Sequence, residues 1–261
     1  MLIARIVRRY SDGARVYFHR GMWMHQTGHR VFVDSPTLDY HHSTFRWWPN
    51  EVESREMYAK DHWFYVYGPR SGDLIVDVGA GKGEDTTTFS SAVGPDGRVI
   101  AIEAHPVTFH CLRLFCEMNA LGNVAPFNFA VTDRPGPVTM QASEAWQANS
   151  IATGNGSGSA TIPGLTLDDF IAREHIRRID LLKMNVEGAE RFAIEGMGET
   201  LRITSAVCIS CHDFRADGGD GEHFRTKALV QEAVTRAGFT VVSRDMDPRP
   251  YIADQVNAFR E

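Results

Sequence analysis

From residue 74 onward, short apolar segments rich in β-branched residues alternate with longer segments whose apolar residues recur at helical spacing. The apolar segments predict strands at 74–80, 98–104, 124–132, 179–185, 205–211, 239–245 and about 251–260. The segments between them predict helices at 84–92, 105–122, 165–174 and 222–238. Strands and helices that alternate in this way form a parallel sheet covered on both faces. We therefore expect a doubly wound α/β domain over residues 71–261.

The first seventy residues follow a different pattern. Residues 14–36 alternate between apolar and polar positions like a β-hairpin, and residues 48–68 have a helical pattern. This region, 1–70, holds four of the five tryptophans, which are Trp23, Trp47, Trp48 and Trp63. Such aromatic density suits a pocket for a sugar-like ligand, and equally a second small core or a dimer contact. We expect a small appendage that contacts the substrate or a second copy of the chain.

Residues 150–164 interrupt the α/β pattern. The segment contains four glycines among serine, threonine and asparagine, a composition that buries little surface. It predicts a mobile loop, which would either close over a substrate or remain solvated.

The charge balance narrows the range of partners. The chain has 27 basic and 33 acidic residues, a net charge of -6. Such a chain has no broad positive field to hold the phosphates of a nucleic acid. We therefore expect a small-molecule substrate.

The cysteines and the N-terminal segment predict a cytoplasmic protein. Arg5, Arg8 and Arg9 interrupt the only apolar stretch near the start, and no apolar segment is long enough to span a bilayer. The cysteines are too few and too clustered for a disulfide framework. They are Cys111, Cys116, Cys208 and Cys211. The last two form a CxxC motif, but it lies in a predicted buried strand, which favours core thiols over a redox or zinc site.

The strongest chemical signal is the segment DVGAGKGED at 77–85, which joins the first strand to a helix. Its glycines permit a tight turn and a close approach of a ligand, and the helix start presents free N–H groups. The spacing GxGxG differs from the GxGxxG of a Rossmann dinucleotide site. Carboxylates also flank the turn, and they favour a cationic ligand such as S-adenosylmethionine over a pyrophosphate.

We expect the cofactor to contact the ends of the first four strands. Glu103 would accept both hydroxyls of the ribose, and the end of the third strand would form the adenine wall. The predicted cofactor-binding residues are Asp77, Gly79, Ala80, Gly81, Gly83, Glu84, Asp85, Glu103, Ala104, Phe129, Ala130 and Met184. NAD remains an alternative, because its ribose would also use Glu103.

Together with DVGAGKGED, the segments LTLDDFI (165–171) and IDLLKMNVEGAE (179–190) resemble the FkbM family of methyltransferases. The resemblance covers roughly residues 50–260, and the KxxVEGAE signature (183–190) is specific to the family. It implies a Rossmann-like fold and transfer of a methyl group from S-adenosylmethionine to a hydroxyl of a sugar, polyketide or related compound. The family usually has Asp where this chain has Asn185, so a metal or base role there is in doubt.

Methyl transfer to an alcohol requires a group that removes the hydroxyl proton. His212 follows the fifth strand, so we expect it at the ligand-binding edge as the general base, beside Asp213. Asn185 would orient the hydroxyl or the methionine amine, and Glu187 would face the pocket. Glu190 would support the start of a helix electrostatically.

Three alternatives remain open from the sequence. Asn185, His212 and Asp213 together would suit a divalent cation such as Mg²⁺ that lowers the pKa of the hydroxyl. An NAD-dependent oxidoreductase is the second alternative. The third is a non-catalytic domain that lost its chemistry at Asn185. Our main hypothesis is an O-methyltransferase that acts on a small hydroxylated acceptor, with a glycoside slightly preferred.

Overall fold

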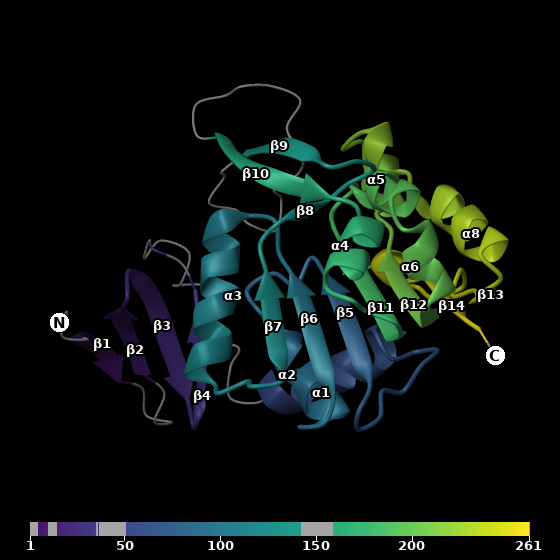
Figure 1. Ribbon diagram of the computed structural model, residues 1–261. Coiled ribbons are helices and arrows are strands. Elements are labelled where there is room, and N and C mark those ends of the chain that lie inside the picture. The colour runs from purple at the N-terminus through teal and green to yellow at the C-terminus, as the bar shows by residue number, and fades with distance from the viewer. Residues whose placement is uncertain (1–4, 10–14, 35, 37–50, 142–158, 261) are drawn as a thin grey trace.

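A sheet of seven strands forms the centre of the computed structural model, which describes residues 5–9, 15–34, 36, 51–141 and 159–260 (Figure 1). In spatial order the strands are β13 (Thr240–Val242), β14 (Gln255–Phe259), β12 (Thr204–Ser210), β11 (Ile179–Asn185), β5 (Leu74–Val78), β6 (Arg98–Ile102) and β7 (Val124–Phe127). Neighbours from β12 to β7 are parallel, whereas β14 is antiparallel to both of its neighbours. The prediction of a doubly wound, mainly parallel sheet is confirmed.

Helices cover both faces of this sheet. They are α1 (Glu51–His62), α2 (Thr86–Val93), α3 (Pro106–Met118), α4 (Leu167–Arg173), α5 (Glu190–Glu195), α6 (Gly198–Arg202), α7 (Asp213–Asp217), α8 (Lys227–Arg236) and α9 (Pro250–Ala253). Side chains alternate between the faces of a strand. On β5, Val76 and Val78 pack in the core with α4, α5, α6 and α8, whereas Ile75 packs with α1 and α2.

Two predicted helices begin where capping groups place them. The Thr166 hydroxyl accepts the Asp169 N–H, so α4 starts one residue later. The predicted helix at 222–238 divides into a 3₁₀ turn, Glu222–Phe224, and α8. The carboxylate of Asp213 accepts the N–H groups of Thr226 and Lys227 and so fixes the start of α8 from a distant part of the chain.

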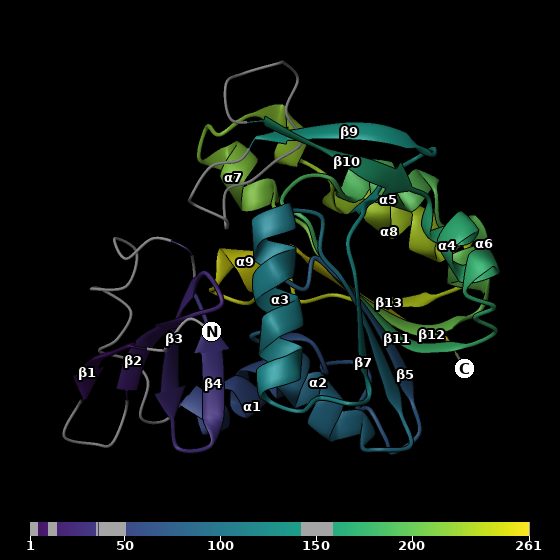
Figure 2. The same ribbon diagram turned by 60° about the vertical axis from the view of Figure 1, so that its left-hand side comes forward.

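The N-terminal segment forms a four-stranded antiparallel sheet, larger than the predicted hairpin (Figure 2). Its strands are β1 (Arg5–Arg9), β2 (Arg15–His19), β3 (Met22–Thr27) and β4 (Arg30–Val33). This sheet packs on α3, where the rings of Phe32 and Phe115 lie 5.9 Å apart. The α1 helix packs elsewhere, because Ala59 and Trp63 enter the core on one face of the central sheet. The proposed boundary at residue 70 stays a prediction.

A third, small sheet lies over the carboxyl ends of the central strands (Figure 1). It contains β8 (Ala130–Val131), β9 (Gly136–Gln141) and β10 (Ser159–Leu165) in the order β8-β10-β9. The predicted strand 124–132 is therefore interrupted between β7 and β8. There the Asn128 amide donates hydrogen bonds to the carbonyls of Glu103 and Ala104, which turns the chain.

The predicted loop at 150–164 is wrong for its described part. Residues 159–164 belong to β10, while 150–158 lie outside the described residues. Gly164 lies opposite Gly136, and a Cβ at Gly164 would lie 2.9 Å from the Gly136 carbonyl oxygen. Close pairing of β9 with β10 thus requires glycine at position 164, although the sequence around it predicted a loop.

Two further findings concern the predictions from composition. All four cysteines are buried free thiols, as expected for core cysteines. Among the described residues, no helix has both the length and the apolar character needed to cross a bilayer.

Candidate active site

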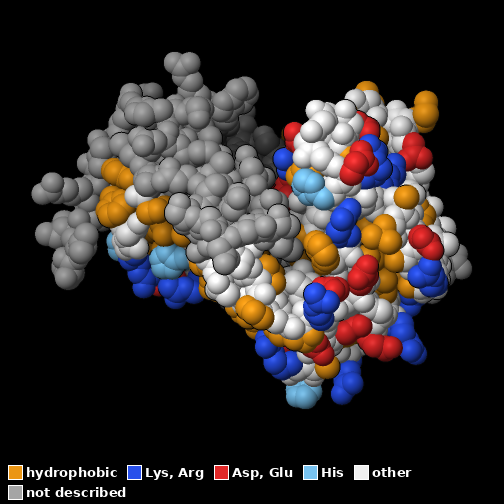
Figure 3. Space-filling view, turned by 90° about the horizontal axis from the view of Figure 1, so that it is seen from above, with side chains coloured by type: hydrophobic (Ala, Val, Ile, Leu, Met, Phe, Trp, Pro, Cys, Tyr) orange, Lys and Arg blue, Asp and Glu red, His pale blue; other side chains and the backbone are white. Residues whose placement is uncertain are grey.

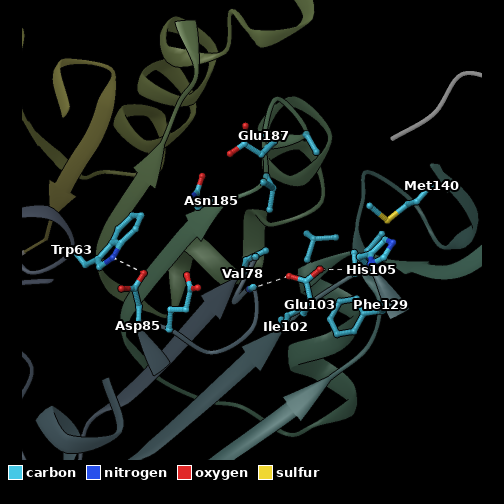
Figure 4. A pocket seen from close by; sticks show the side chains of 18 of the residues that line it. Trp63, Val78, Asp85, Ile102, Glu103, His105, Phe129, Met140, Asn185 and Glu187 are labelled. Carbon is cyan, nitrogen blue, oxygen red and sulfur yellow. Dashed lines mark hydrogen bonds between the residues drawn. The ribbon is translucent and has the colours of Figure 1, made fainter. Parts of the chain in front are cut away.

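A cleft of about 730 Å³ opens at the carboxyl ends of β5, β6 and β11 (Figure 4). This volume is in the range of small-molecule sites. Ten of the residues predicted from the sequence line it. They are Gly79, Gly81, Glu84, Asp85, Glu103, Ala104, Phe129, Ala130, Asn185 and Glu187. The sequence therefore located most of the cleft, although several predicted residues act elsewhere.

The glycine turn follows β5 and forms the floor of the cleft. Gly79 has a φ of 75°, and a Cβ there would lie 1.9 Å from the carbonyl oxygen of Asn185. The N–H groups of Gly79 and Ala80 both donate to the carbonyl of Ile102, which ties the turn to β6. Ala80 therefore holds the turn in place and does not line the cleft.

Gly83, also predicted to contact the cofactor, has a packing role. Its φ is 93°, and a Cβ there would lie 2.7 Å from the Phe115 ring and 3.0 Å from Leu112. The residue thus allows α3 to approach the turn closely. Gly83 therefore contributes to the packing of α3 beneath the glycine turn and does not line the cleft.

Asp77 does not face the cleft, contrary to the expectation that its charge attracts a cationic ligand. Its carboxylate is fully buried and accepts a hydrogen bond of 2.7 Å from the Lys183 ammonium, which lies opposite it on β11. The same ammonium donates to the carbonyl of Gly79 and lies over the Trp63 ring. The pair fixes β5 against β11, and Lys183 offsets the charge of Asp77.

The carboxylate of Glu103 ends β6 inside the cleft. One oxygen accepts the Gly81 N–H at 3.0 Å, and the other accepts the His105 N–H at 2.8 Å (Figure 4). Each carboxylate oxygen can accept a further hydrogen bond. Burial raises the pKa of Glu103 to about 7, although these two backbone donors oppose the shift.

An apolar wall lies next to Glu103. Phe129 and Ala130 line this end of the cleft together with Ile102 and Met140, and their contact with adenine stays a prediction. Met184, which was also predicted to bind the cofactor, does not line the cleft, because its side chain is buried in the main core on the α4 and α8 face.

Asn185 and Glu187 lie at the opposite end of the cleft (Figure 4). The Oδ1 atom of Asn185 is buried and accepts no hydrogen bond from the described residues. Glu187 has a φ of 52°, a left-handed conformation that is unfavourable for a residue with a side chain. Its two carboxylate oxygens contact His212 at 3.3 Å and Arg215 at 2.8 Å. The local fold thus holds one carboxylate in a fixed orientation beside an available amide oxygen.

His212 does not line the cleft and has no free ring nitrogen. Its Nε2 contacts Glu187, and its Nδ1 lies 2.9 Å from the buried carboxylate of Glu190. Burial alone would lower the pKa of His212, but the hydrogen bonds to both glutamates outweigh it and raise the pKa to about 9. At neutral pH the ring carries both protons, so it cannot serve as the expected general base.

The residues suggested for a divalent cation do not form a metal site. The Oδ1 atom of Asp213 accepts two backbone N–H groups at the start of α8, and both nitrogens of His212 are engaged by glutamates. Over the described part of the chain, no group of three or more His, Cys, Asp or Glu side chains suits a metal ion.

Other residues of the site were missed or given too small a role. Trp63 lines the cleft and its indole N–H donates to Asp85 at 3.0 Å, but the sequence offered only a cluster of tryptophans. Tyr58, Phe214 and Tyr251 also line the cleft and carried no local signal. Glu190 was expected to act on a helix start, whereas its carboxylate is buried against His212.

The fold and the cleft define a class of protein. A glycine turn after β5, a carboxylate at the end of β6 and further carboxylates along the cleft fit S-adenosylmethionine. The protein is an S-adenosylmethionine-dependent methyltransferase. Residues 77–240 match the family described as methyltransferase FkbM domain, and the chain belongs to this family. The NAD alternative is set aside.

The chain is similar to several known methyltransferases. Over 175 residues the chain is 26% identical to the hexuronic acid methyltransferase AglP of Haloferax volcanii. This match covers 67% of this chain and 68% of that protein. A solved methyltransferase FkbM from Methylobacillus flagellatus is 18% identical, with a TM-score of 0.48 over 73% of this chain. The match spans only 44% of that protein. A methyltransferase from Aquifex aeolicus is 15% identical, with a TM-score of 0.47 over 80% of this chain and 96% of its own.

The raised pKa of Glu103 predicts pH-dependent cofactor binding. We expect the ionised carboxylate to accept the ribose hydroxyls, so affinity should rise as the group loses its proton near pH 7. The Kd for S-adenosylhomocysteine should be about tenfold higher at pH 6 than at pH 8, as calorimetry can measure. Burial lowers the pKa of His105, which moves the titration of its ring away from that of Glu103.

Glu103→Gln is the matched control, because it keeps the shape and removes the titrating group. Its affinity should be weaker and flat over the same pH range. If the wild-type Kd did not change between pH 6 and 8, Glu103 would not be the ribose ligand.

Proposed function

We propose that the protein transfers a methyl group from S-adenosylmethionine to a hydroxyl oxygen of a sugar or glycoside. The observation that carries the proposal is the fixed carboxylate of Glu187 beside the available Oδ1 atom of Asn185, at the end of the cleft away from Glu103. Each hydroxyl group donates one hydrogen, so a sugar with adjacent hydroxyls suits this pair of acceptors. A non-catalytic role is not favoured, because Asn185 keeps an acceptor where the family usually has Asp.

S-adenosylmethionine supplies an electrophilic methyl carbon when it is bound. Gly79 and Gly81 let its methionine portion approach the backbone, Glu103 accepts its ribose hydroxyls, and Glu84 and Asp85 supply negative charge near the glycine turn. Asn185 and Glu187 would remain at the other end of the cleft to contact the acceptor. Binding both reactants in one cleft removes most of the entropic barrier to their encounter.

Asn185 and Glu187 prepare the acceptor. The Oδ1 atom of Asn185 would accept a hydrogen bond from a neighbouring hydroxyl of the acceptor, and the Glu187 carboxylate would take the proton of the reacting hydroxyl as the methyl group is transferred. Burial alone would raise the pKa of Glu187, but His212 and Arg215 outweigh it and lower the pKa. A weak base suffices, because a methylated hydroxyl is far more acidic than the free alcohol. His212 acts here as a positioning residue.

The sugar acceptor is favoured by two observations. Aromatic side chains from α1, α7 and α9 line the cleft, and flat aromatic faces bind pyranose rings. The Haloferax volcanii relative is named as a hexuronic acid methyltransferase. Charged side chains of both signs are interspersed over the described residues of the face in Figure 3, a distribution unlike the basic stripe of a nucleic-acid site.

A panel of acceptors tests the proposal. Purified protein is incubated with methyl-labelled S-adenosylmethionine and with hexuronates, neutral glycosides, polyketide alcohols and amines. Label should pass to at least one sugar at a rate well above that of every amine. Preferential labelling of amines or of polyketides would overturn the sugar assignment.

A further inference from the structure

A buried histidine at the cofactor end of the cleft has one ring nitrogen without a partner. His105 follows Glu103 by two residues, lines the cleft and is 6% exposed. Its Nε2 atom is buried and has no hydrogen-bond partner among the described residues. An unpaired buried polar group costs free energy, and native proteins leave few of them. This nitrogen therefore favours a ligand that supplies the missing partner.

The start of α3 determines which ring nitrogen of His105 carries the proton. His105 is the N-cap of α3, where its Nδ1 atom accepts the Thr108 N–H at 3.4 Å. The Thr108 hydroxyl lies 3.1 Å from the same atom. A neutral imidazole has a single N–H group, so the proton belongs on Nε2 when Nδ1 is an acceptor. Burial lowers the pKa of His105, which keeps the ring neutral at neutral pH. His105 therefore offers the cleft an N–H donor.

The surroundings of the ring indicate which ligand group accepts this hydrogen bond. Phe129, Ala130 and Met140 form the apolar wall at the same end of the cleft, next to Glu103 (Figure 4). A nucleoside whose ribose is held by Glu103 would place its base along this wall. Adenine is flat, and its ring nitrogens accept hydrogen bonds. It matches both the apolar wall and the N–H donor.

We propose that the Nε2–H group of His105 donates a hydrogen bond to one ring nitrogen of the adenine of S-adenosylmethionine. Apolar side chains hold a flat base without fixing its rotation, whereas a hydrogen bond to one nitrogen fixes it. His105 is thus a specificity residue for the base of the cofactor. This inference concerns the cofactor alone, so it holds or fails independently of the proposed sugar acceptor.

Analogues of S-adenosylhomocysteine test the contact in the wild-type protein. In the 1-deaza, 3-deaza and 7-deaza forms, a C–H group replaces one ring nitrogen of adenine. Calorimetry should show that one of the three binds about tenfold more weakly than the parent compound, because its C–H group leaves the His105 donor unpaired. Binding of all three analogues within twofold of the parent compound would overturn the proposal.

His105→Asn shows whether the loss comes from this histidine. Asparagine keeps a side-chain oxygen that caps α3, but it is too short to place a donor where Nε2 lies. The variant should bind S-adenosylhomocysteine about tenfold more weakly than wild type and should not distinguish the sensitive analogue from it. His105→Ser also keeps a capping oxygen and should behave in the same way.

His110→Asn is the matched control, because it makes the same substitution on α3 at a residue that does not line the cleft. It should bind all four ligands like wild type. If folded His105→Asn or His105→Ser discriminated against the sensitive analogue as strongly as wild type does, another residue would make the contact and the proposal would be wrong. Methylation of the acceptor is not needed for any of these measurements, so their outcome leaves the proposed function untouched.

Discussion

Replacement of Gly79 by alanine is expected to raise the Kd for S-adenosylhomocysteine by at least about a hundredfold. The alanine Cβ would overlap the Asn185 carbonyl oxygen, 1.9 Å away, and neither atom belongs to a flexible side chain. The positive φ adds about 1–2 kcal/mol of strain for a residue with a Cβ. The ends of β5 and β11 would have to separate, and both the glycine turn and Asn185 would leave their positions. Calorimetric titration measures the loss.

Gly122→Ala is the matched control. A Cβ at Gly122 meets no atom within 4 Å, and its backbone is not left-handed, so this variant should bind the ligand like wild type. Thermal melting of both variants separates a local effect on the cleft from general unfolding. Tight binding by a folded Gly79→Ala protein would show that the turn is not the cofactor floor.

Replacement of Glu187 by glutamine is expected to lower kcat by about 10²–10³-fold while cofactor affinity stays within a few-fold of wild type. Glutamine keeps the size of the side chain but cannot take a proton from the acceptor hydroxyl. It also weakens the contacts to His212 and Arg215, which hold the carboxylate in the cleft. Single-turnover kinetics with a sugar acceptor would separate the chemical step from product release.

His212→Asn distinguishes a proton acceptor from the residue that positions it. His212 has a pKa near 9, so at neutral pH it is a cation that holds the Glu187 carboxylate in place. It loses this charge at higher pH. Wild-type kcat should therefore fall above about pH 9, and His212→Asn should be slower and lack that alkaline decrease. If kcat instead rose as His212 lost its proton, His212 and not Glu187 would be the general base. Full activity in Glu187→Gln would also contradict the mechanism.

The charge of the cleft differs from what the glycine-turn motif alone suggests. Asp77 and Asp85 are the first and last residues of the motif, but register places Asp77 opposite Lys183 inside the sheet. The cleft instead receives its negative charge from Glu84, Asp85, Glu103 and Glu187. Strand register depends on contacts between distant segments, so a motif shows which residue types are present but not which of them face the ligand.

Much of the fold was predictable because its signals are local. Alternating apolar segments gave the central strands and most helices, and the glycine turn with Glu103 located the cofactor end of the cleft. The small sheet was missed because Gly164 and Pro163 are typical of loops, and only their pairing with Gly136 and Pro137 makes them a strand.

The acceptor end of the cleft was less predictable. His212 has the residue type and position of a general base, but Glu190, 22 residues earlier, engages its second nitrogen and raises its pKa. Similarly, an ion pair between Asp61 and Arg249, which are 188 positions apart, joins α1 to the start of α9. Such long-range contacts leave no periodic signal in the sequence, so the roles of these residues followed from the structure.

The bond that the methyl group forms is the most direct test of the account. The sugar that accepts label best is incubated with the protein and with S-adenosylmethionine carrying a ¹³C methyl group, and the product is examined by NMR. We expect a single labelled methyl carbon, bonded to an oxygen that is a substituent of the sugar ring. The same signal should be absent when Glu187→Gln replaces the wild-type protein. A label on nitrogen or carbon, or equal product from the variant, would contradict it.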